Sequence, residues 1–446
     1  MQQFARDIAW DVGRSVAAPL HGRGRSYPAS LVLLYDADKA PTRELVGKGH
    51  TFNSSILSPQ YQRNADGSYT DVGTGPAVDT FDGEKWLRSC GAVTNLLPSG
   101  AEDLSSWDKI QANVASAGLP TPYGGEAYRI SATSAVEIHQ VYKISSGSAP
   151  GTYTVSGLVK KDTTRYVVVA LSASNEAPSI FAAIDFDLKE INLIDGTGQI
   201  ALEELRDGWF LYTITGAVIE GDGVATSFIY VLINNSGDGY YAGDGESVLV
   251  GEIQLTQTSY PVPYTPPGTT MPASNATTTN GCWFTLADGS PVWDALSGGP
   301  MTLATRVRMG VGSGDLLAPV NHYVYSGGGG YVQYSYVGGG FVQVVTAFDG
   351  TTGKSSTIVT WPRNSIIRRV TQVNIAGTQF RVGYMIEGTH TTIQWSSWQA
   401  YDGSFDPSTL YRLMLGYANP YPMWFNKIAV WNTQVDDATI LKWMNP

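Results

Sequence analysis

Cysteine is almost absent from this sequence, since Cys90 and Cys282 are the only two in 446 residues. A secreted framework held by disulfides needs more cysteines than that, and these two fall in different predicted domains. The N-terminus also lacks the basic start and the apolar core of a signal peptide. We therefore expect two unpaired thiols in a protein that is synthesised in a reducing cytoplasm.

Charged residues are also scarce, at 15% of the chain, and they leave a formal net charge of −11. This acidic balance argues against a nucleic-acid partner, because neutralising phosphates requires a basic surface. No run approaches the about 18 consecutive apolar residues of a membrane span, so we expect no membrane insertion. The abundant residues are glycine (50), tyrosine (25) and tryptophan (12), a composition typical of a β-rich protein with many turns.

Patterns that carry catalysis are missing too. The five histidines are scattered without the spacing of a zinc site, and no Gly-x-Ser-x-Gly turn is present. A β-sandwich glycanase needs two carboxylates that flank the scissile bond. The nearest pair is Asp185 and Asp187, which share one strand face but lie in the middle of the chain, and we interpret them as solvated strand carboxylates. The sequence therefore predicts a protein that is not an enzyme.

One loop offers metal ligands. Asp238 and Asp244 lie in a glycine-rich stretch and could bind calcium through their carboxylate oxygens. Turn formation explains the same two residues, and both interpretations stay open. We expect no other cofactor.

The first 26 residues carry four arginines against two aspartates and predict a short helix over residues 3–18, ended by Pro19. One narrow apolar stripe on a short helix is marginal alone, so this helix needs a surface to pack on. A basic segment suits an acidic partner surface; a solvated terminus, self-association and packing on the same chain are the alternatives. The residues expected to dock the chain to a partner are Phe4, Arg6, Ile8, Val12, Arg14 and Val16.

The rest of the chain divides into three parts by its turn signals. Residues 27–93 predict an extended, irregular region with one β-hairpin around residues 64–67. From residue 94, short apolar runs alternate with turn clusters and predict an antiparallel sandwich of the jelly-roll kind. The expected strands are 127–132, 153–160, 165–172, 180–187, 209–217, 227–234 and 247–257. The proline-rich segment 260–268 then predicts a stiff linker.

The last part predicts a second β-unit. Residues 301–309 and 370–375 are expected strands, and the glycine- and tyrosine-rich tract 323–345 predicts two hairpins. The apolar runs 411–416 and 424–431 flank a proline-containing turn, as two neighbouring strands would. A short helix is expected after Asn432, because apolar residues take helical spacing there and carboxylates stand at its start.

Aromatic residues are abundant and could form a binding site, because exposed rings stack on the C–H faces of sugars while amides and carboxylates form hydrogen bonds with the hydroxyls. Two clusters are candidates for carbohydrate binding. One is Trp395, Trp398, Gln399, Tyr401 and Asp402, and the other is Tyr331, Gln333, Tyr334 and Tyr336. The alternative is that these rings fill a core or a subunit interface.

Three blocks, in order, resemble the structural proteins of tailed-bacteriophage and phage-like particles. Residues 27–97 resemble the lead-in to their first sandwich. The second block, with Tyr153-Thr-Val-Ser-Gly157 and the closing Ser259-Tyr-Pro-Val-Pro-Tyr-Thr265, resembles carbohydrate-binding modules of the family-4/9 type. The third, Trp424-Phe-Asn-Lys-Ile-Ala-Val-Trp-Asn432 followed by Val435-Asp-Asp-Ala-Thr-Ile440, resembles the end of concanavalin A-like (laminin G-like) lectin domains.

The resemblance, together with the strand pattern, sets the expected fold class. We expect an all-β chain of two tandem antiparallel β-sandwiches. These are a jelly roll over residues 94–268 and a concanavalin A-like lectin domain over residues 269–446. Residues 1–93 are expected to form the short N-terminal helix and an extended virion-docking arm.

The resemblance also implies a function. It predicts a non-enzymatic virion structural protein, a head or tail fibre or spike component that adheres to host surface polysaccharide. Its expected place is the virion surface after synthesis in the host cytoplasm. The implied partners are other virion proteins of the capsid or tail, further copies of the chain in a homotrimer, and a host surface glycan. A purely structural capsid decoration protein and a tailspike polysaccharide depolymerase are the alternatives.

Overall fold

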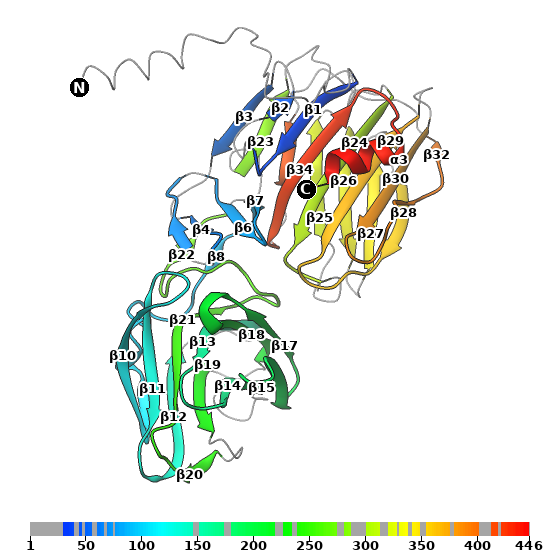
Figure 1. Cartoon of the computed structure of the whole chain (residues 1–446). Helices are drawn as coiled ribbons and strands as arrows, with labels where there is room; N and C mark the ends of the chain where they lie inside the picture. Colours follow the sequence, from blue (N-terminus) through cyan, green and yellow to red (C-terminus); the bar gives the residue numbers. More distant parts are fainter. Residues whose placement is uncertain are drawn as a thin grey trace, which may run out of the picture.

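The structure, a computed structural model, is almost entirely β-structure, arranged in two antiparallel sandwiches that lie end to end (Figure 1). This arrangement confirms the all-β sandwich fold class. The residues that the structure describes are 30–39, 44–46, 50–55, 60–66, 69–74, 76–145, 151–173, 180–218, 226–233, 239–273, 281–286, 300–312, 320–327, 330–337, 341–347, 354–374, 379–400, 412–417 and 421–445.

The smaller sandwich contains the middle of the chain. Its strands are β9 (Asp108–Ile110), β10 (Ala112–Pro120), β11 (Glu126–Ala132), β12 (Val136–Ser145), β13 (Gly151–Lys161), β14 (Tyr166–Ala173), β15 (Ile180–Asp185), β16 (Glu190–Asp195), β17 (Gln199–Glu204), β18 (Trp209–Val218), β19 (Thr226–Ile233), β20 (Tyr240–Ala242) and β21 (Ser247–Thr256). Two 3-10 turns, η1 (Leu104–Ser106) and η2 (Arg206–Gly208), lie in the connections. One sheet has the order β10-β11-β21-β13-β18-β17, and the other has the order β16-β15-β14-β19-β12-β20 with β9 beside β12. Every strand predicted in this region is present.

Apolar side chains from the two sheets of the smaller sandwich meet in one core. Tyr212 on β18 and Tyr230 on β19 belong to opposite sheets, and their hydroxyls share a hydrogen bond of 2.7 Å. Burial raises the pKa of both hydroxyls, so the pair stays neutral. Trp107 packs beside Tyr230 and donates its indole N–H to the Ala101 carbonyl at 3.0 Å. The two tyrosine hydroxyls and the Trp107 indole N–H are therefore paired inside this core.

The larger sandwich contains both ends of the described chain. Its first sheet is formed by β1 (Leu31–Asp36), β2 (Glu44–Val46), β6 (Val78–Phe81), β7 (Glu84–Ser89), β24 (Met301–Met309), β29 (Ile366–Val373), β30 (Gln379–Ile386), β31 (Gln394–Trp395), β32 (Gln399–Ala400) and β34 (Met423–Trp431). Its second sheet is formed by β3 (His50–Ser55), β23 (Gly281–Leu286), β25 (Val320–Gly327), β26 (Gly330–Val337), β27 (Phe341–Ala347), β28 (Lys354–Val359) and β33 (Arg412–Tyr417).

The described part of the expected irregular arm differs from the prediction, because its strands complete the larger sandwich. β1 pairs antiparallel with β34 from Leu31 to Asp36, and every residue of β1 is buried. β3 pairs with β23, and β7 pairs with β34 (Figure 1). An apolar run such as that of β1 indicates burial, but it does not show that the strand's partner lies at the other end of the chain. The predicted helix over residues 3–18 lies outside the described residues.

The two sandwiches are joined by a two-stranded ribbon, in which β8 (Val93–Thr94) pairs with β22 (Thr270–Met271). The chain enters the smaller sandwich along β8 and leaves it along β22, so the smaller sandwich is inserted into the larger one. The predicted hairpin around residues 64–67 is also present, as β4 (Tyr61–Arg63) and β5 (Tyr69–Asp71). Both ribbons lie at the junction between the sandwiches (Figure 1).

The end of the chain contains a confirmed helix and a corrected strand pairing. Helix α3 (Asp437–Met444) begins where the Asp436 carboxylate accepts a hydrogen bond from the Thr439 amide at 2.7 Å, and it packs on the first sheet through Ile440 and Trp443. β33 and β34 were expected to be neighbours, but β33 pairs with β23 and β25 in the second sheet. Apolar runs around a turn indicate two strands without showing whether the turn crosses between sheets. No helix within the described residues is long and apolar enough to span a membrane.

The glycine- and tyrosine-rich tract folds as predicted, because β25, β26 and β27 pair consecutively through two hairpins. Cys90 is fully buried, and burial raises the pKa of its thiol to about 12. The Cys282 side chain lies outside the described residues. Cys90 is therefore a small core residue rather than a reactive thiolate.

A buried arginine joins the N-terminal strands to the C-terminal ones. The Arg306 guanidinium on β24 donates to both oxygens of Glu387 at 2.7 and 2.9 Å, and also to Glu84 at 2.9 Å and Asn426 at 2.8 Å. Its charge also lies 4.8 Å from the centre of the Trp86 ring. Burial alone would raise the pKa of Glu387, but the guanidiniums of Arg306 and Arg368 hold it below its ordinary value. The network links β7, β24, β34 and the residue after β30.

We expect Arg306→Ala to lower the free energy of unfolding by about 3 kcal/mol, because the substitution leaves the mostly buried Glu84 carboxylate without its cation and leaves Glu387 with Arg368 alone. Arg129→Ala is the matched control, since Arg129 is 45% exposed, whereas Arg306 is 2% exposed, and its loss is expected to cost about 1 kcal/mol or less. Urea unfolding followed by tryptophan fluorescence measures both losses. Equal losses in the two variants would contradict a structural role for the Arg306 network.

A fragment of residues 269–446 is expected not to fold by itself, because it lacks β1 and β7, which pair with β34, and β3, which pairs with β23. A fragment of residues 93–271 contains a complete core and its closing ribbon, and it is expected to unfold cooperatively. Circular dichroism and thermal unfolding of the two fragments check this. A stable, monomeric 269–446 fragment would contradict the discontinuous larger sandwich.

Candidate functional site

The predicted tryptophan cluster is built around Arg381 on β30. The Arg381 guanidinium lies over the Trp395 ring at 3.9 Å and over the Trp398 ring at 4.7 Å from the ring centres. Trp395 donates its indole N–H to the Asp437 carboxylate of α3 at 3.0 Å. Its ring packs against Gly383, where a Cβ would collide with it. Both tryptophans are half-buried, and Trp395 is held by contacts within the chain.

The other predicted carbohydrate-binding residues are only partly covered by the structure. Gln399 lies beside the tryptophans on β32, whereas Tyr401 and Asp402 lie outside the described residues. Tyr331, Gln333, Tyr334 and Tyr336 all belong to β26, a strand paired on both sides, and their side chains also lie outside the description. The six docking residues from Phe4 to Val16 precede the first described residue. The structure therefore brings together Trp395, Trp398 and Gln399 alone.

The predicted acidic residues are not gathered into a metal site in the described part of the chain. Asp244 is exposed, Asp238 lies outside the described residues, and no group of three or more His, Cys, Asp or Glu side chains is found within the described part. Asp185 forms two hydrogen bonds with Arg165, at 2.6 and 3.0 Å, and these bonds hold its pKa below the ordinary value. It also accepts hydrogen bonds from the amides of Asp187 and Leu188. Asp185 is therefore a turn residue that ends β15.

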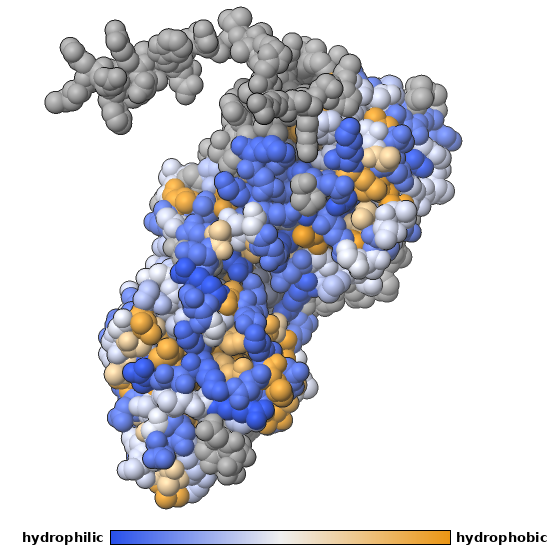
Figure 2. Space-filling view, viewed as in Figure 1, coloured by the Kyte–Doolittle hydropathy of each residue, from blue (hydrophilic) through white to orange (hydrophobic). Residues whose placement is uncertain are grey.

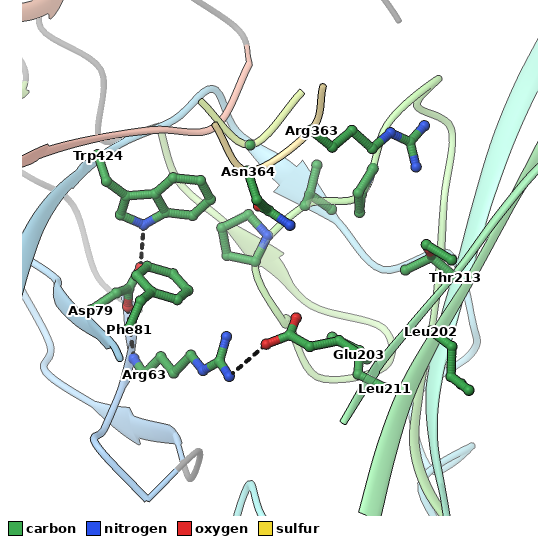
Figure 3. A pocket seen from close by; sticks show the side chains of 15 residues that line it. Arg63, Asp79, Phe81, Leu202, Glu203, Leu211, Thr213, Arg363, Asn364 and Trp424 are labelled. Carbon is green, nitrogen blue, oxygen red and sulfur yellow. Dashed lines mark hydrogen bonds and ion pairs between the residues drawn. The ribbon is translucent and has the colours of Figure 1, made fainter. Parts of the chain in front are cut away.

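A cleft that the sequence did not reveal lies between the two sandwiches and has a volume of about 320 Å³. The smaller sandwich contributes one wall from β17 and β18 and a second from the segment after β21. The larger sandwich contributes β4, β6, β34 and the turn before β29 (Figure 3). The lining residues are Arg63, Asp79, Phe81, Ala201, Leu202, Glu203, Leu211, Thr213, Pro261, Val262, Pro263, Gly310, Arg363, Asn364 and Trp424.

Asp79 organises the aromatic wall of this cleft. Its carboxylate accepts the Trp424 indole N–H at 2.6 Å and the Arg63 backbone N–H at 2.7 Å (Figure 3). The Phe81 ring meets the Trp424 ring edge-on with centres 5.2 Å apart. The guanidiniums of Arg63 and Arg308 lie over Phe81 at 4.9 and 4.2 Å. The wall is thus an aromatic pair with fixed ring orientations and guanidinium groups beside it.

Polar contacts across the cleft hold the two sandwiches together. Arg63 donates to Glu203 at 3.0 Å (Figure 3), and Arg363 donates to Gln199 on the same strand, β17. Arg206 pairs with Asp66 at 3.0 Å in an adjoining cavity of about 240 Å³, which Arg63 and Glu203 also line. The Arg63–Glu203 pair therefore lies where the two cavities meet. The contacts are mostly half-exposed, so each contributes about 1 kcal/mol or less.

The segment predicted as a stiff linker forms part of the cleft instead. The Thr265 amide donates to Gln254 at 2.6 Å, and Asn95 donates to the Thr265 carbonyl at 2.9 Å. Tyr264 packs on the outer face of the six-stranded sheet. Pro261 and Pro263 line the cleft, where their rings need no backbone donor partner. Proline content predicts a segment outside the central strands, but it does not show which surface that segment packs on.

A narrow cavity of about 40 Å³ adjoins the cleft, since Leu211, Thr213, Pro261 and Val262 line both. Glu252 lines this smaller cavity with only 9% of its surface exposed. Its Oε1 accepts hydrogen bonds from the Thr121 hydroxyl at 2.6 Å and the Gly125 amide at 2.7 Å, while its Oε2 has no partner among the described residues. Burial raises the pKa of Glu252 to about 7, although the hydrogen bonds from Thr121 and Gly125 act in the other direction and lower it.

We expect Glu252 to make the protein less stable as the pH rises. The folded chain holds the Glu252 proton up to about pH 7, whereas the unfolded chain releases it near 4.5. The stabilisation is therefore fully present below about pH 4.5, and it is lost as the pH rises from there through about 7. The loss is at most about 3 kcal/mol. Glu252→Gln has no proton to lose, so its melting temperature is expected to exceed that of the unaltered chain more at about pH 8 than at about pH 5.

The control for this measurement is Glu190→Gln, which makes the same chemical change at an exposed position. Thermal unfolding of the three proteins at both pH values is the measurement. The control is expected to follow the unaltered chain at both. A Glu252→Gln melting temperature that differs by the same amount at the two pH values would contradict the raised pKa.

A third surface lies at the far end of the smaller sandwich. Tyr240 on β20 is 61% exposed and pairs in register with Ile138 on β12, which is also exposed, as is Val136. Figure 2 shows apolar colour at this lower end of the molecule and a mainly hydrophilic face over the junction. This patch consists of exposed side chains on two paired strands, whereas the cleft combines concavity, aromatic rings and polar groups.

Sequence signals for the cleft are weak but present. Glu252 is a lone charge in the apolar run of β21 and follows Gly251, a combination that indicates a β-bulge at a buried position. The structure has this bulge: the register of β13 with β21 shifts between Ser156 and Leu158, and Glu252 has a φ of 50°. No comparable local signal marks Arg63 or Asn364, because the cleft forms only when distant segments meet.

Comparisons with known proteins give no family. No protein-family model matches the chain, and no curated protein matches it. Among solved structures, the chain is similar to the binding domain of botulinum neurotoxin DC in complex with rat synaptotagmin II, at 12% identity and a TM-score of 0.28, over 38% of this chain and 41% of that one. The chain thus spans less than half of that neurotoxin domain.

Two further solved structures are similar over most of the chain. One is GH43B of a Bacteroides ovatus xyloglucan PUL, at 10% identity and a TM-score of 0.24, over 85% of this chain and 98% of that one. The other is a xylan β-1,4-xylosidase from Bacillus halodurans C-125, at 12% identity and a TM-score of 0.22, over 86% of this chain and 85% of that one. Likenesses of this size assign no function to the chain.

Proposed function

We propose that this chain is a non-enzymatic structural protein of a bacteriophage particle, a head or tail fibre or spike component that adheres to host surface polysaccharide. The cleft between the two sandwiches is the proposed saccharide site. The proposal includes virion proteins of the capsid or tail as partners of the N-terminal segment and a homotrimer as the assembly. Its particle context rests on the sequence resemblance of the three blocks described above.

The observation that supports a saccharide site is the composition of the cleft walls. Phe81, which is half-buried, and Trp424, which is 7% exposed, line the cleft, while Arg363, Asn364 and Glu203 supply hydrogen-bonding groups around them. A sugar carries apolar C–H faces and a rim of hydroxyls, so it needs this mixture. The cleft volume of about 320 Å³ falls in the lower part of the about 300–1,000 Å³ range of small-ligand sites. A short saccharide suits it, and several copies of the chain would add avidity.

A capsid decoration protein with a purely structural role is the second candidate, and one observation favours it. Trp395 is committed to contacts within the chain, because its N–H bonds to Asp437 and one face of its ring is covered by Arg381. The tryptophan surface is therefore a weaker sugar platform than the sequence indicated. A chain of this kind would reinforce a particle and bind no glycan.

The test is glycan binding by the full chain and by variants that separate the two surfaces. Arg363→Ala and Asn364→Gly alter the cleft; glycine is chosen because Asn364 has a φ of 60°, where alanine would add strain. Each is expected to weaken binding about tenfold, the loss of one hydrogen bond. Trp398→Ala probes the tryptophan surface, and Arg206→Ala removes a junction ion pair outside the larger cavity as the control.

The measurement uses the biotinylated chain multimerised on streptavidin and a panel of purified bacterial surface polysaccharides. Binding that survives Trp398→Ala and Arg206→Ala but weakens in both cleft variants supports the proposal. Loss of binding in Trp398→Ala alone would show that the saccharide binds the tryptophan surface and not the cleft. Failure of the multimerised chain to bind any polysaccharide contradicts adhesion and favours decoration. New reducing ends released from a bound polysaccharide would instead identify a depolymerase.

A further inference from the structure

The narrow cavity at Glu252 adds a specificity element to the cleft. We propose that this cavity is a subsite that takes one hydroxymethyl group of a neutral saccharide, whose hydroxyl donates a hydrogen bond to Glu252 Oε2 and accepts one from the Thr213 hydroxyl. The inference rests on the proposed function, because it places the rest of the saccharide in the cleft. It names the substrate class as neutral hexoses that keep their exocyclic hydroxyl.

The two polar atoms that carry this subsite are both buried without partners. Glu252 Oε2 and Thr213 Oγ1 have no hydrogen-bond partner among the described residues, and the two side chains are 9% and 6% exposed. Both residues line the narrow cavity. A buried polar atom without a hydrogen-bond partner costs about 1–3 kcal/mol. A ligand hydroxyl that bonds to both atoms would remove this cost, and the gain would add to the affinity for the ligand. A hydroxyl fits because it can donate and accept at once.

The size and the walls of the cavity limit what can enter. Its volume of about 40 Å³ exceeds the about 10–15 Å³ that one water needs, and it leaves room for a group of hydroxymethyl size. Tyr123 and Tyr264 both line it, and their rings pack against each other with their centres 5.4 Å apart. Thr213 lines both cavities, so a group carried by a molecule in the cleft reaches Glu252 past this residue.

The charges around the two cavities favour a neutral ligand. The cleft is lined by two guanidiniums, those of Arg63 and Arg363, and by two carboxylates, those of Asp79 and Glu203, so its formal charges balance. An anionic group in the narrow cavity would meet the Glu252 carboxylate. A neutral hydroxyl avoids that repulsion and gains a charge-assisted hydrogen bond when Glu252 is ionised.

The backbone positions Glu252 for this role at some cost. The residue has a φ of 50° at a β-bulge of β21, a conformation that non-glycine residues rarely adopt. Gly125 lies so close to Glu252 that a Cβ there would collide with Oε1. A regular strand would direct residue 252 elsewhere, so the bulge and Gly125 together hold the carboxylate in the cavity. Strain of this kind is found most often at functional sites.

The test compares sugars that differ only in the exocyclic hydroxyl. Methyl glycosides of glucose, galactose and mannose and their 6-deoxy counterparts are titrated into the full chain at about pH 8, where Glu252 is ionised, with isothermal calorimetry or saturation-transfer NMR as the readout. In at least one pair, the hydroxymethyl sugar is expected to bind on the order of tenfold to a hundredfold more tightly. Glu252→Gln and Thr213→Val, which preserve side-chain size, are expected to reduce this preference about tenfold each.

Glu190→Gln is the control, and it is expected to keep the preference of the unaltered chain. Equal binding of the two sugars in every pair overturns the subsite, as does a preference that survives both Glu252→Gln and Thr213→Val. If Arg363→Ala and Asn364→Gly still weaken binding in either case, the saccharide site in the cleft stands without this subsite. If the unaltered chain binds none of the glycosides and no polysaccharide, the subsite and the proposed function both fall.

Discussion

The guanidinium of Arg306 is almost completely buried, so its charge needs acceptors inside the protein, and the chain supplies them from three distant places. Glu84 comes from the N-terminal strands, Asn426 from the last strand, and Glu387 from the turn after β30. These groups satisfy the cation only when all three segments are in place. The larger sandwich therefore closes as a unit. The cleft depends on this closure, because Phe81, which lines the cleft, pairs with Glu84 in one hairpin.

Much of the fold was predictable because local sequence decides local structure. β24 was predicted with its observed ends, since Pro300 and Gly310 bound an apolar run of strand length. Helix α3 was predicted from its carboxylates and its apolar spacing. The role of residues 31–36 was not predictable, because their burial pattern is the same whether the partner strand is near or far along the chain. The prediction that β33 lies beside β34 was wrong for a similar reason, because an apolar run does not identify its partner strand.

The candidate site was less accessible to sequence reasoning than the fold. Composition drew attention to Trp395 and Trp398, and the structure does bring them together, but around Arg381, whose part no spacing rule indicates. The cleft depends on Arg63, Glu203 and Arg363, which come from three separate segments and meet only after both sandwiches have formed. Glu252 could have been noticed as a charge within a buried strand, yet its unpartnered oxygen is visible only in three dimensions.

The insertion of one sandwich into the other has a consequence for biosynthesis. During translation, the strands of the smaller sandwich emerge in one continuous stretch and can assemble at once, since domains fold as units when their segments are complete. β1 emerges earlier and can pair with β2 along one edge, but its other edge has no partner until β34 leaves the ribosome. For that interval β1 presents an unpaired, apolar strand edge in the nascent chain, a risk for aggregation. The yield of this protein in a cell should therefore depend on chaperone capacity and on elongation rate across the second half of the message.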